Sequence, residues 1–491
     1  MNIYRITALI LGGMVLLTGC GSTTAEAASA ETAPPQKETA NAKADTQQDE
    51  TVNAETEAPE KETVNPDSTD SAASPKGEIT AVEAVCPETV GEGMNAEEFL
   101  NSDAYWEWLE NYEEKTEVSV GMQEGMDPYY EAVLGELLGK ETDENTVCSP
   151  LNIYVALSML AEVTDGNTRA QVLNVLQEDD IEQLRSRTQA LWDANYLDTP
   201  VIKSQLANSM WLRNDFSYHS DTLRRLAEDY HSSSYSGVMG TEEMNAMLQG
   251  WTDDHTGGLL SEYTKDMELN QDTVLALVSA IYYKVAWHDK FEEDLTDTAE
   301  FHGTAGDQQV SMMHKDKKMT YYRTDRLKAV SLGLTDSGRM YFLLPEEGTD
   351  VKEIVTDPDA IKIIRNPYET ESSNPIVHLS VPKFKVSDKT DLLGHLKSLG
   401  ITEVTNPYAA DFTPLTDETD AIWLSGAEHA AMVEIDEEGV TGAAYTEEVM
   451  DALGIMAETE EVDFVLDRPF YFAVTGKDGS ILFAGVVQKI E

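Results

Sequence analysis

The chain has 491 residues and a formal net charge of −57, because 91 Asp and Glu residues far outnumber 34 Lys and Arg residues. Binding to nucleic acid through its phosphates requires clusters of Lys and Arg, so this charge argues against nucleic acid as a partner. The three cysteines, Cys20, Cys86 and Cys148, are too few for a disulfide framework or a cysteine-rich metal cluster.

The N-terminus has the pattern of a secretory signal, which predicts a signal peptide over residues 1–19. A positive charge within Met1–Arg5 precedes an apolar stretch, Ile6–Leu17, and Leu-Thr-Gly then leads to Cys20. This end resembles a bacterial lipobox, in which the cysteine is lipid-modified and becomes the new N-terminus. We therefore expect an extracytoplasmic, cell-surface lipoprotein of a bacterium; the alternative is an ordinary signal peptide with a chance cysteine.

Residues 20–90 are predicted to form a disordered acidic tether. They consist mainly of Ala, Glu, Thr, Ser, Asp, Pro and Lys with almost no aromatic residues, so they cannot bury enough apolar surface to fold. No later segment reaches the roughly 18 apolar residues of a membrane-spanning helix. The pattern predicts a chain that is held at a membrane by a lipid on Cys20 and does not span it.

Helices dominate the first part of the predicted folded region. Residues 91–126 are expected to form a helical extension, with a helix over Met94–Tyr112, and Tyr129–Leu138 is a second amphipathic helix. A short strand then precedes a Ser-Pro break that starts a helix, and this helix is expected to end near Asp165. Cys148 lies in the apolar strand, where a buried free thiol is expected; a bridge to Cys86 is the alternative.

Strands dominate the remainder. Thr273–Trp287 is apolar almost throughout, which predicts a strand buried on both faces. Residues 329–334 and 340–345 are expected to pair, residues 375–386 alternate as a strand does, and residues 470–487 form a hairpin at Lys477-Asp478-Gly479. The order of elements predicts an α+β domain with large, mainly antiparallel sheets.

The chain carries no recognisable catalytic or cofactor motif. Gly-rich phosphate loops, His-Glu-x-x-His and Cys-x-x-Cys are missing, so we expect no cofactor, no metal and no enzyme activity. His429 and Glu434 lie five apart on a predicted strand and would face opposite sides, which disfavours a shared metal. The acidic run Asp436–Glu438 has the composition of a solvated strand end.

Several strings, taken in order, resemble one family, the serpins. The resemblance lies in "NTVCSPLNIYVALSMLAEVTDGNT", "LANSMWL", the spacing of Trp251, Thr256 and Gly258, "TVLALVSAIYYKVAWHDKF", "VSMMH", "VPKFKV", "ADFTPL" and "DRPFYFAV". Each string alone is weak, but the ordered series covers about Asp127–Glu491. We therefore assign residues 127–491 to a serpin domain.

The resemblance implies a fold with three β-sheets, about eight or nine helices and an exposed reactive-centre loop. It also implies a suicide-substrate inhibitor of serine endopeptidases, whose loop is cleaved to an acyl-enzyme and then inserts into the central sheet. Trp287 and Glu437 match the end of the sheet where the loop enters. The segment that matches the loop hinge comprises Glu437, Glu438, Gly439, Val440, Thr441, Gly442, Ala443, Ala444, Tyr445 and Thr446.

The side chains of this hinge suit insertion as a strand. Side chains alternate between the two faces of a strand, so Val440, Gly442, Ala444 and Thr446 would face the core, and all four are small or uncharged. The next inward residue, Glu448, is the doubtful one, because burying an unpaired carboxylate is costly.

Counting from the hinge as in the family puts the scissile bond near Leu453-Gly454, within the window Met450–Met456. No Lys or Arg occurs from Gly439 to Asp467, which disfavours a trypsin-like target. The apolar residues of the window suit chymotrypsin-like, elastase-like or subtilisin-like peptidases, and a Glu-specific peptidase remains an alternative.

The resemblance further implies a sheet-opening network of Ser149, Asn152, Ser279 and His429, although Asn152 and Ser279 differ from the residues usual in the family. The expected partners are a target serine peptidase, in a covalent complex with a monomeric inhibitor, and a membrane. Alternatives are a non-inhibitory serpin that acts as a binding module, an inhibitor of cysteine peptidases, and a lipoprotein that captures small solutes.

Overall fold

The computed structural model describes residues 79–140, 142–259, 261–418, 422–440 and 460–490. Its N-terminal segment contains one strand and two helices, β1 (Thr80–Val82), α1 (Ala96–Leu100) and α2 (Asp103–Met122). Asn95 and Glu98 form a capping box that starts α1, and the Ser102 side chain accepts a hydrogen bond from the Tyr105 amide at the start of α2. This cap divides the single helix predicted for Met94–Tyr112 into two.

Ten further α-helices lie in the described residues. They are α3 (Asp127–Leu138), α4 (Pro150–Glu162), α5 (Gly166–Leu176), α6 (Ile181–Asn195), α7 (Ser220–Asp229), α8 (Glu242–Asp254), α9 (Ser261–Thr264), α10 (Val351–Val355), α11 (Pro358–Arg365) and α12 (Leu392–Ser398). Ser149 caps α4 just before its first-turn proline, and Asp165 caps α5, as the predicted breaks require. Among the described helices, none is both long and apolar enough to cross a membrane.

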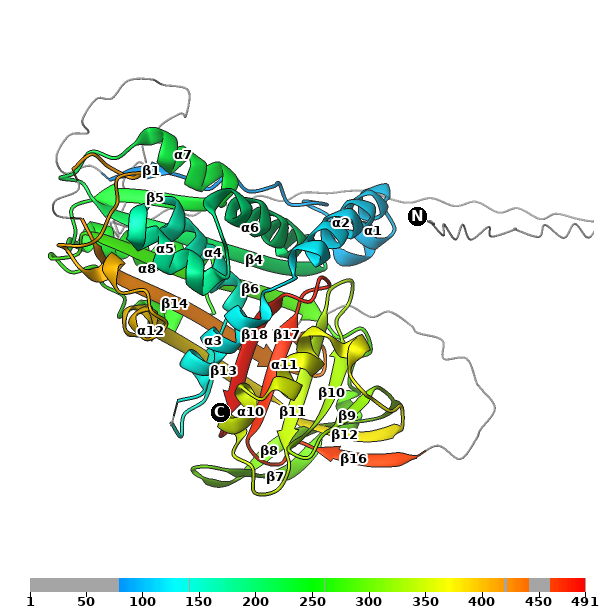
Figure 1. Cartoon of the computed structure of the whole chain (residues 1–491). Helices are drawn as coiled ribbons and strands as arrows, with labels where there is room; N and C mark the ends of the chain where they lie inside the picture. Colours follow the sequence, from blue (N-terminus) through cyan, green and yellow to red (C-terminus); the bar gives the residue numbers. More distant parts are fainter. Residues whose placement is uncertain (1–78, 141, 260, 419–421, 441–459, 491) are drawn as a thin grey trace, which may run out of the picture. The chain divides into compact units, whose positions relative to one another are not determined.

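The first and largest sheet, sheet A, has the strand order β1-β5-β4-β6-β15-β14-β13, with β3 paired to β4 (Figure 1). Its strands are β3 (Leu197–Asp198), β4 (Ile202–Arg213), β5 (Ser232–Gly237), β6 (Leu275–Ala286), β13 (Phe384–Asp391), β14 (Leu424–Ile435) and β15 (Gly439–Val440), besides β1. The central strand β6 is buried almost throughout, as predicted from its continuous apolar sequence.

Two smaller sheets complete the fold. Sheet B has the order β2-β18-β17-β11-β10-β9, formed by β2 (Thr146–Cys148), β18 (Ile481–Val487), β17 (Phe470–Thr475), β11 (Arg339–Pro345), β10 (Leu327–Gly333) and β9 (Tyr321–Arg323). Sheet C has the order β16-β12-β8-β7, formed by β16 (Glu461–Val465), β12 (Ile376–Pro382), β8 (Gly306–Lys318) and β7 (Asp297–Gly303). The predicted α+β class and its three sheets are confirmed. Both predicted hairpins are confirmed as well, whereas residues 375–386 form two strands in different sheets.

The described residues include part of the segment predicted as tether. β1 pairs antiparallel with β5 and adds an outer strand to sheet A, and Ala81 is buried against it. The low aromatic content of residues 20–90 gave no indication of this strand. A strand of three residues that pairs with the edge of an existing sheet does not need a hydrophobic core of its own. The rest of the tether, the signal peptide and Cys20 lie outside the described residues.

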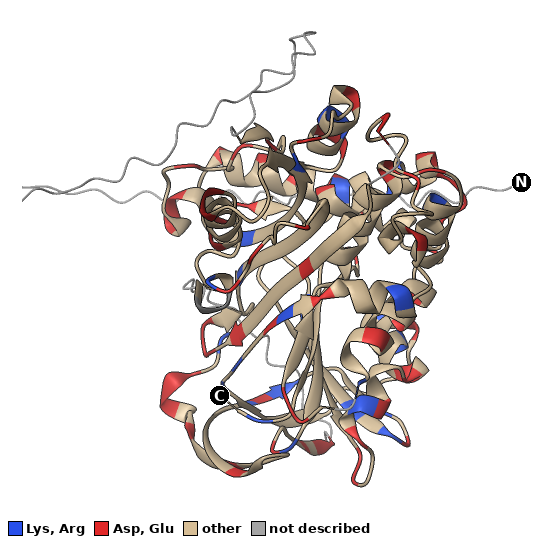
Figure 2. Cartoon of the chain, turned by 90° about the vertical axis from the view of Figure 1, so that its left-hand side faces the viewer, with Lys and Arg blue, Asp and Glu red and all other residues tan. Residues whose placement is uncertain are grey.

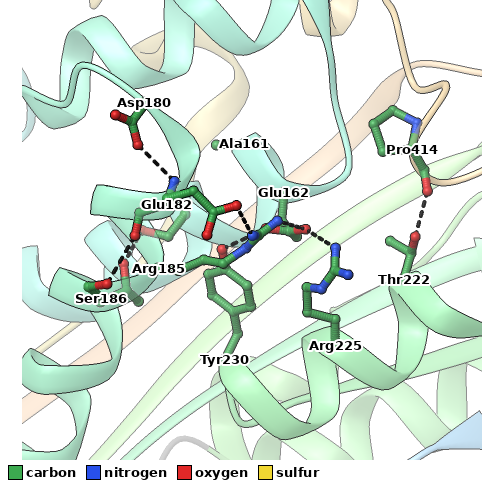
Figure 3. A network of polar contacts seen from close by, with 12 residues as sticks. Ala161, Glu162, Asp180, Glu182, Arg185, Ser186, Thr222, Arg225, Tyr230 and Pro414 are labelled. Carbon is green, nitrogen blue, oxygen red and sulfur yellow. Dashed lines mark hydrogen bonds and ion pairs between the residues drawn. The ribbon is translucent and has the colours of Figure 1, made fainter.

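Most surface charge in the described part is acidic, with Lys and Arg fewer and interspersed (Figure 2). Several carboxylates of the described residues are buried, among them that of Glu162. Glu162, at the end of α4, accepts hydrogen bonds from Arg185 of α6, Arg225 of α7 and the Tyr230 hydroxyl, at 2.8–2.9 Å (Figure 3). Burial opposes ionisation, but the two guanidinium groups outweigh it and lower the pKa of Glu162. This network joins three helices.

Candidate functional site

The site lies at the end of sheet A where β14 turns back on itself. After Ile435 the chain makes a tight turn and returns as β15, which lies between β6 and β14. Gly439 and Val440 pair antiparallel with Ala286 and Val285 of β6, and Val440 also pairs with Ile435. Two residues of the predicted hinge, Gly439 and Val440, therefore already lie within the sheet.

Backbone hydrogen bonds hold this turn to the end of β6. The Asp436 carboxylate accepts the amides of Glu438 and Gly439 at 2.9 and 3.1 Å, which closes the turn. The indole Nε1 of Trp287 donates to the Asp436 carbonyl at 2.8 Å, and the Trp287 amide donates to the Glu438 carbonyl at 3.0 Å. The Phe291 amide donates to the Glu437 carbonyl at 3.1 Å.

Two ion pairs add to these backbone contacts. Glu437 is buried; it binds the Lys383 ammonium at 2.5 Å and accepts a hydrogen bond from the Thr296 hydroxyl at 2.7 Å. Burial disfavours its charge, but these two donors outweigh burial and lower the pKa of Glu437. Glu438 binds Lys290 at 2.5 Å. The acidic run is therefore a paired and partly buried turn, and the expectation of a simple solvated strand end was wrong for Glu437.

Gly439 requires the absence of a side chain. A Cβ atom there would lie 2.3 Å from the Val285 carbonyl oxygen and 2.7 Å from the Ala286 Cα. Val440, the first residue expected to face the core, is fully buried in the main hydrophobic core. We use the name hinge site for Glu437–Val440 together with their partners Trp287, Lys290, Thr296 and Lys383.

Beyond the hinge site, β6 and β14 pair directly with each other in parallel. The pairs run from Leu424 with Leu275 to Ala430 with Ala280. A strand that extended β15 along the sheet would have to replace these pairs. Because adjacent strands lie about 4.8 Å apart, the separation of β6 and β14 would double.

Buried polar groups join β6 and β14 to α4 at this point, and we call them the polar network. Its members are Ser149, Asn152, Asn208, Ser279 and His429, all at most 3% exposed. The Ser149 amide donates to His429 Nε2 at 2.9 Å, and His429 Nδ1 lies 3.2 Å from the Ser279 hydroxyl. Asn152 Nδ2 donates to the Ser279 hydroxyl at 2.8 Å and to the Ala280 carbonyl at 2.7 Å.

These contacts define the protonation of His429. Because Nε2 accepts the Ser149 amide, the proton of the neutral ring is on Nδ1, which donates to Ser279. The ring is fully buried among neutral groups, and burial lowers the pKa of His429 to about 3. The network is therefore uncharged at neutral pH.

The structure brings together all four residues predicted for the network, and it adds Asn208. The Asn208 amide of β4 donates to Asn152 Oδ1 at 2.8 Å. Sequence reasoning also missed Lys383 and Thr296, the partners of Glu437. Asn208 is a polar residue in the middle of an apolar strand, and this position could have identified it from the sequence. No such pattern indicates Lys383 and Thr296, because both lie far from Glu437 along the chain.

Neither thiol forms a disulfide. Cys148 is buried and Cys86 is exposed, and both are free, as expected for Cys148. Burial raises the pKa of the Cys148 thiol. Within the described ranges, Glu300, His302 and Asp307 place possible ligand atoms within 4.8 Å of one another, but all three side chains are exposed and His302 is already paired with Asp307 at 2.8 Å.

Several predicted site residues lie outside the described residues. From the hinge these are Thr441, Gly442, Ala443, Ala444, Tyr445 and Thr446. The others are the inward residue Glu448, the scissile bond Leu453-Gly454 with its window Met450–Met456, and the lipidation site Cys20. Their assignments stay predictions.

Comparison with known proteins gives a consistent result. The family profile described as Serpin (serine protease inhibitor) matches residues 132–490. The leukocyte elastase inhibitor of Equus caballus is 31% identical over 355 residues, which cover 70% of this chain and 92% of the relative. Serpin-ZX of Arabidopsis thaliana is 28% identical over 367 residues, with the same two coverages. The solved structure of Arabidopsis AtSerpin1 in its native stressed conformation has a TM-score of 0.68 at 25% identity, over 75% of this chain and 98% of that chain.

Proposed function

This chain belongs to the serpin family, and from that premise we propose that it is a suicide-substrate inhibitor of serine endopeptidases. The family is one of peptidase inhibitors and not of enzymes, in agreement with the missing catalytic motifs. In the proposed reaction the target peptidase attacks a peptide bond of the reactive-centre loop and forms an acyl-enzyme. The cleaved loop then extends β15 between β6 and β14 and carries the peptidase with it.

The observation that carries this proposal is the position of β15. Gly439 and Val440 are already hydrogen-bonded between the two strands that a longer insertion would separate. The insertion would therefore start with Val440 in the core. Gly442, Ala444 and Thr446, at alternate positions after it, are small or uncharged and suit the same face of an inserted strand.

We propose that the target is a chymotrypsin-like, elastase-like or subtilisin-like peptidase and not a trypsin-like one. Support comes from the absence of Lys and Arg between Gly439 and Asp467 and from Leu453 and the methionines within the predicted window. A relative named leukocyte elastase inhibitor points in the same direction.

The test is incubation of the full chain with one peptidase of each class. We expect a covalent complex that survives SDS, together with a released peptide whose N-terminus, read by mass spectrometry, lies within residues 451–456. An Ala444→Arg variant should be cleaved by the same peptidase without complex, because a long charged side chain would face the core on insertion. Cleavage of the unaltered chain without any complex contradicts the proposal.

We further propose that Cys20 carries a lipid that holds the protein at the surface of a bacterial cell. Support comes from the signal-like residues 1–19 and the lipobox resemblance. Fractionation of cells that express the chain should place it with membranes, and Cys20→Ser should release it. A Cys86→Ser variant is the matched control and should stay with the membrane. Equal release of both variants, or of neither, argues against the anchor.

A further inference from the structure

The N-terminal segment before α3 is fastened to the domain along its whole described length, and we call residues 79–126 the N-terminal strap. β1 pairs with the outer strand β5, and the Val85 amide donates to the Ala227 carbonyl at 2.9 Å. The Thr89 hydroxyl donates to Asp198 at 2.7 Å. Phe99 and Tyr112 are buried in the main core. Figure 1 shows α2 beside α6, with α1 next to α2.

The C-terminal end of α2 is bound to the hairpin between β17 and β18. The buried Asp478 carboxylate accepts hydrogen bonds from the Ser119 hydroxyl at 2.5 Å and the Gln123 amide at 3.1 Å. Arg365 donates to Gln123 Oε1 at 2.7 Å and to the Gly479 carbonyl at 2.6 Å. The strap therefore joins the outer edge of sheet A to sheet B.

One residue of the strap contacts the turn that holds the end of β6. The Tyr105 hydroxyl of α2 donates to the Asp336 carboxylate at 2.8 Å. Asp336 lies in the turn between β10 and β11 and has a positive φ of 46°, so this position tolerates few residue types. A Cβ on Gly338 of the same turn would lie 1.7 Å from the Thr475 carbonyl, so the turn is also pressed against β17.

This turn is hydrogen-bonded to the end of β6 that pairs with β15. The Thr335 amide donates to the Ala286 carbonyl at 3.0 Å, and the His288 amide donates to the Gly333 carbonyl at 3.0 Å. The Ser337 hydroxyl lies 3.1 Å from the Tyr283 hydroxyl of β6. Ala286 pairs in turn with Gly439 of the hinge site. A short series of contacts thus runs from Tyr105 through the turn to the first inserted residue.

We propose that the N-terminal strap restrains the opening of sheet A at the hinge site, and that Tyr105 is the residue that positions the turn against β6. The proposal rests on the proposed function, because it concerns the step in which the loop separates β6 from β14. The two strands are already apart at Ala286, where β15 lies, so the remaining separation concerns the pairs from Leu275 to Ala280. If β6 moves as one strand in that step, its end takes the turn with it, and the turn must leave Tyr105. The strap then sets how readily the loop enters.

The test compares two full-length variants that each remove one hydroxyl. In Tyr105→Phe we expect amide hydrogen exchange at Trp287, Phe291 and Thr335 to accelerate about fivefold, the change in an opening equilibrium that one lost hydrogen bond produces. Tyr368 is 98% exposed, so Tyr368→Phe should leave this exchange unchanged. Asp336→Asn retains an acceptor for Tyr105 and should remain close to the unaltered protein.

A second measurement follows insertion itself. A labelled synthetic peptide with the sequence TGAAYTEEVMDA, residues 441–452, should anneal faster to Tyr105→Phe than to the unaltered chain. Unchanged exchange in Tyr105→Phe, or equal acceleration in Tyr368→Phe, overturns the proposal.

Neither measurement uses a peptidase. If exchange accelerates but no peptidase forms a complex, the strap proposal stands and the inhibitory function fails; if a complex forms but exchange is unchanged, the inhibitory function stands and the strap proposal fails.

Discussion

The hinge site and the polar network both hold β6 and β14, but they do so with different chemistry. The hinge site uses ion pairs and backbone hydrogen bonds at the end of the sheet, where Lys290 and Lys383 are partly exposed. The polar network uses neutral groups that are buried completely or nearly so. Solvent can replace lost contacts at the hinge site, whereas a group freed in the network finds no water. We therefore expect the hinge site to open locally and the network to open only with the sheet.

The largest expected effect is that of Asn152→Ala in the polar network. The variant leaves the Ala280 carbonyl and the Asn208 amide without their partner. Each buried unsatisfied group costs about 1–3 kcal/mol, so we expect a loss of about 3 kcal/mol or more in the free energy of unfolding, measured in urea. Asn374 is exposed, and Asn374→Ala should change stability by no more than about 0.5 kcal/mol. A loss below about 1 kcal/mol in Asn152→Ala would mean that the network is hydrated.

The second effect is acid destabilisation through His429. Its pKa is about 3 in the folded protein against 6.5 as the ordinary value, so below pH 6.5 the unfolded chain binds a proton that the folded chain does not. Stability therefore falls as pH falls from about 6.5 to 3, by about 2–3 kcal/mol between pH 6.5 and 4.5. Urea unfolding at stepped pH measures this slope.

Two variants sharpen this measurement. His429→Gln should reduce the slope between pH 6.5 and 4.5, although His231, whose pKa burial also lowers, retains part of it. A hydrogen bond from its ring to Asp316 raises the pKa of His378. Its effect on stability therefore has the opposite sign to that of His429: the stabilisation is present at low pH and is lost as pH rises. His378→Gln should therefore leave the acid slope in place. An unchanged slope in His429→Gln contradicts a neutral buried imidazole.

The third effect is that of Gly439→Ala at the hinge site. The added methyl group would meet the β6 backbone at 2.3 Å, so β15 should leave the sheet and expose Val440. We expect a loss of about 2 kcal/mol, the scale of burying one Val side chain, with exchange of the Trp287 and Phe291 amides accelerated far more than that of core amides. Gly394 lies in α12 with open space around it, and Gly394→Ala should stabilise the protein slightly. Equal protection in both variants would show that β15 is not seated as described.

The smallest effect is that of Glu437→Gln, which removes the charge and retains a hydrogen-bond acceptor for Thr296. We expect a loss of about 1 kcal/mol, because Lys383 is 39% exposed and solvent replaces part of the ion pair. The pKa of Glu437 is lowered in the folded protein. Its contribution to the free energy of unfolding is therefore present above the ordinary pKa of 4.5 and is lost as pH falls through the lowered pKa. Exchange of the Phe291 amide at pH 7, compared between Glu437→Gln and the unaltered chain in low and in high salt, measures this loss. A loss as large as that of Asn152→Ala would mean that the hinge site and the polar network do not differ in this way.

The sequence alone determined the family, the α+β class, the two hairpins and the buried strand β6, because these follow from residue order, period and turn chemistry over short distances. It also identified Ser149, Asn152, Ser279 and His429 as one network through family resemblance. Only the tertiary structure decided that Lys383 and Thr296 bind the Glu437 carboxylate, that β1 extends sheet A, and that Tyr105 reaches Asp336. These contacts join residues 54 to 231 positions apart on separate elements. Local propensity carries no information about such pairs, because their geometry exists only after the sheets have formed.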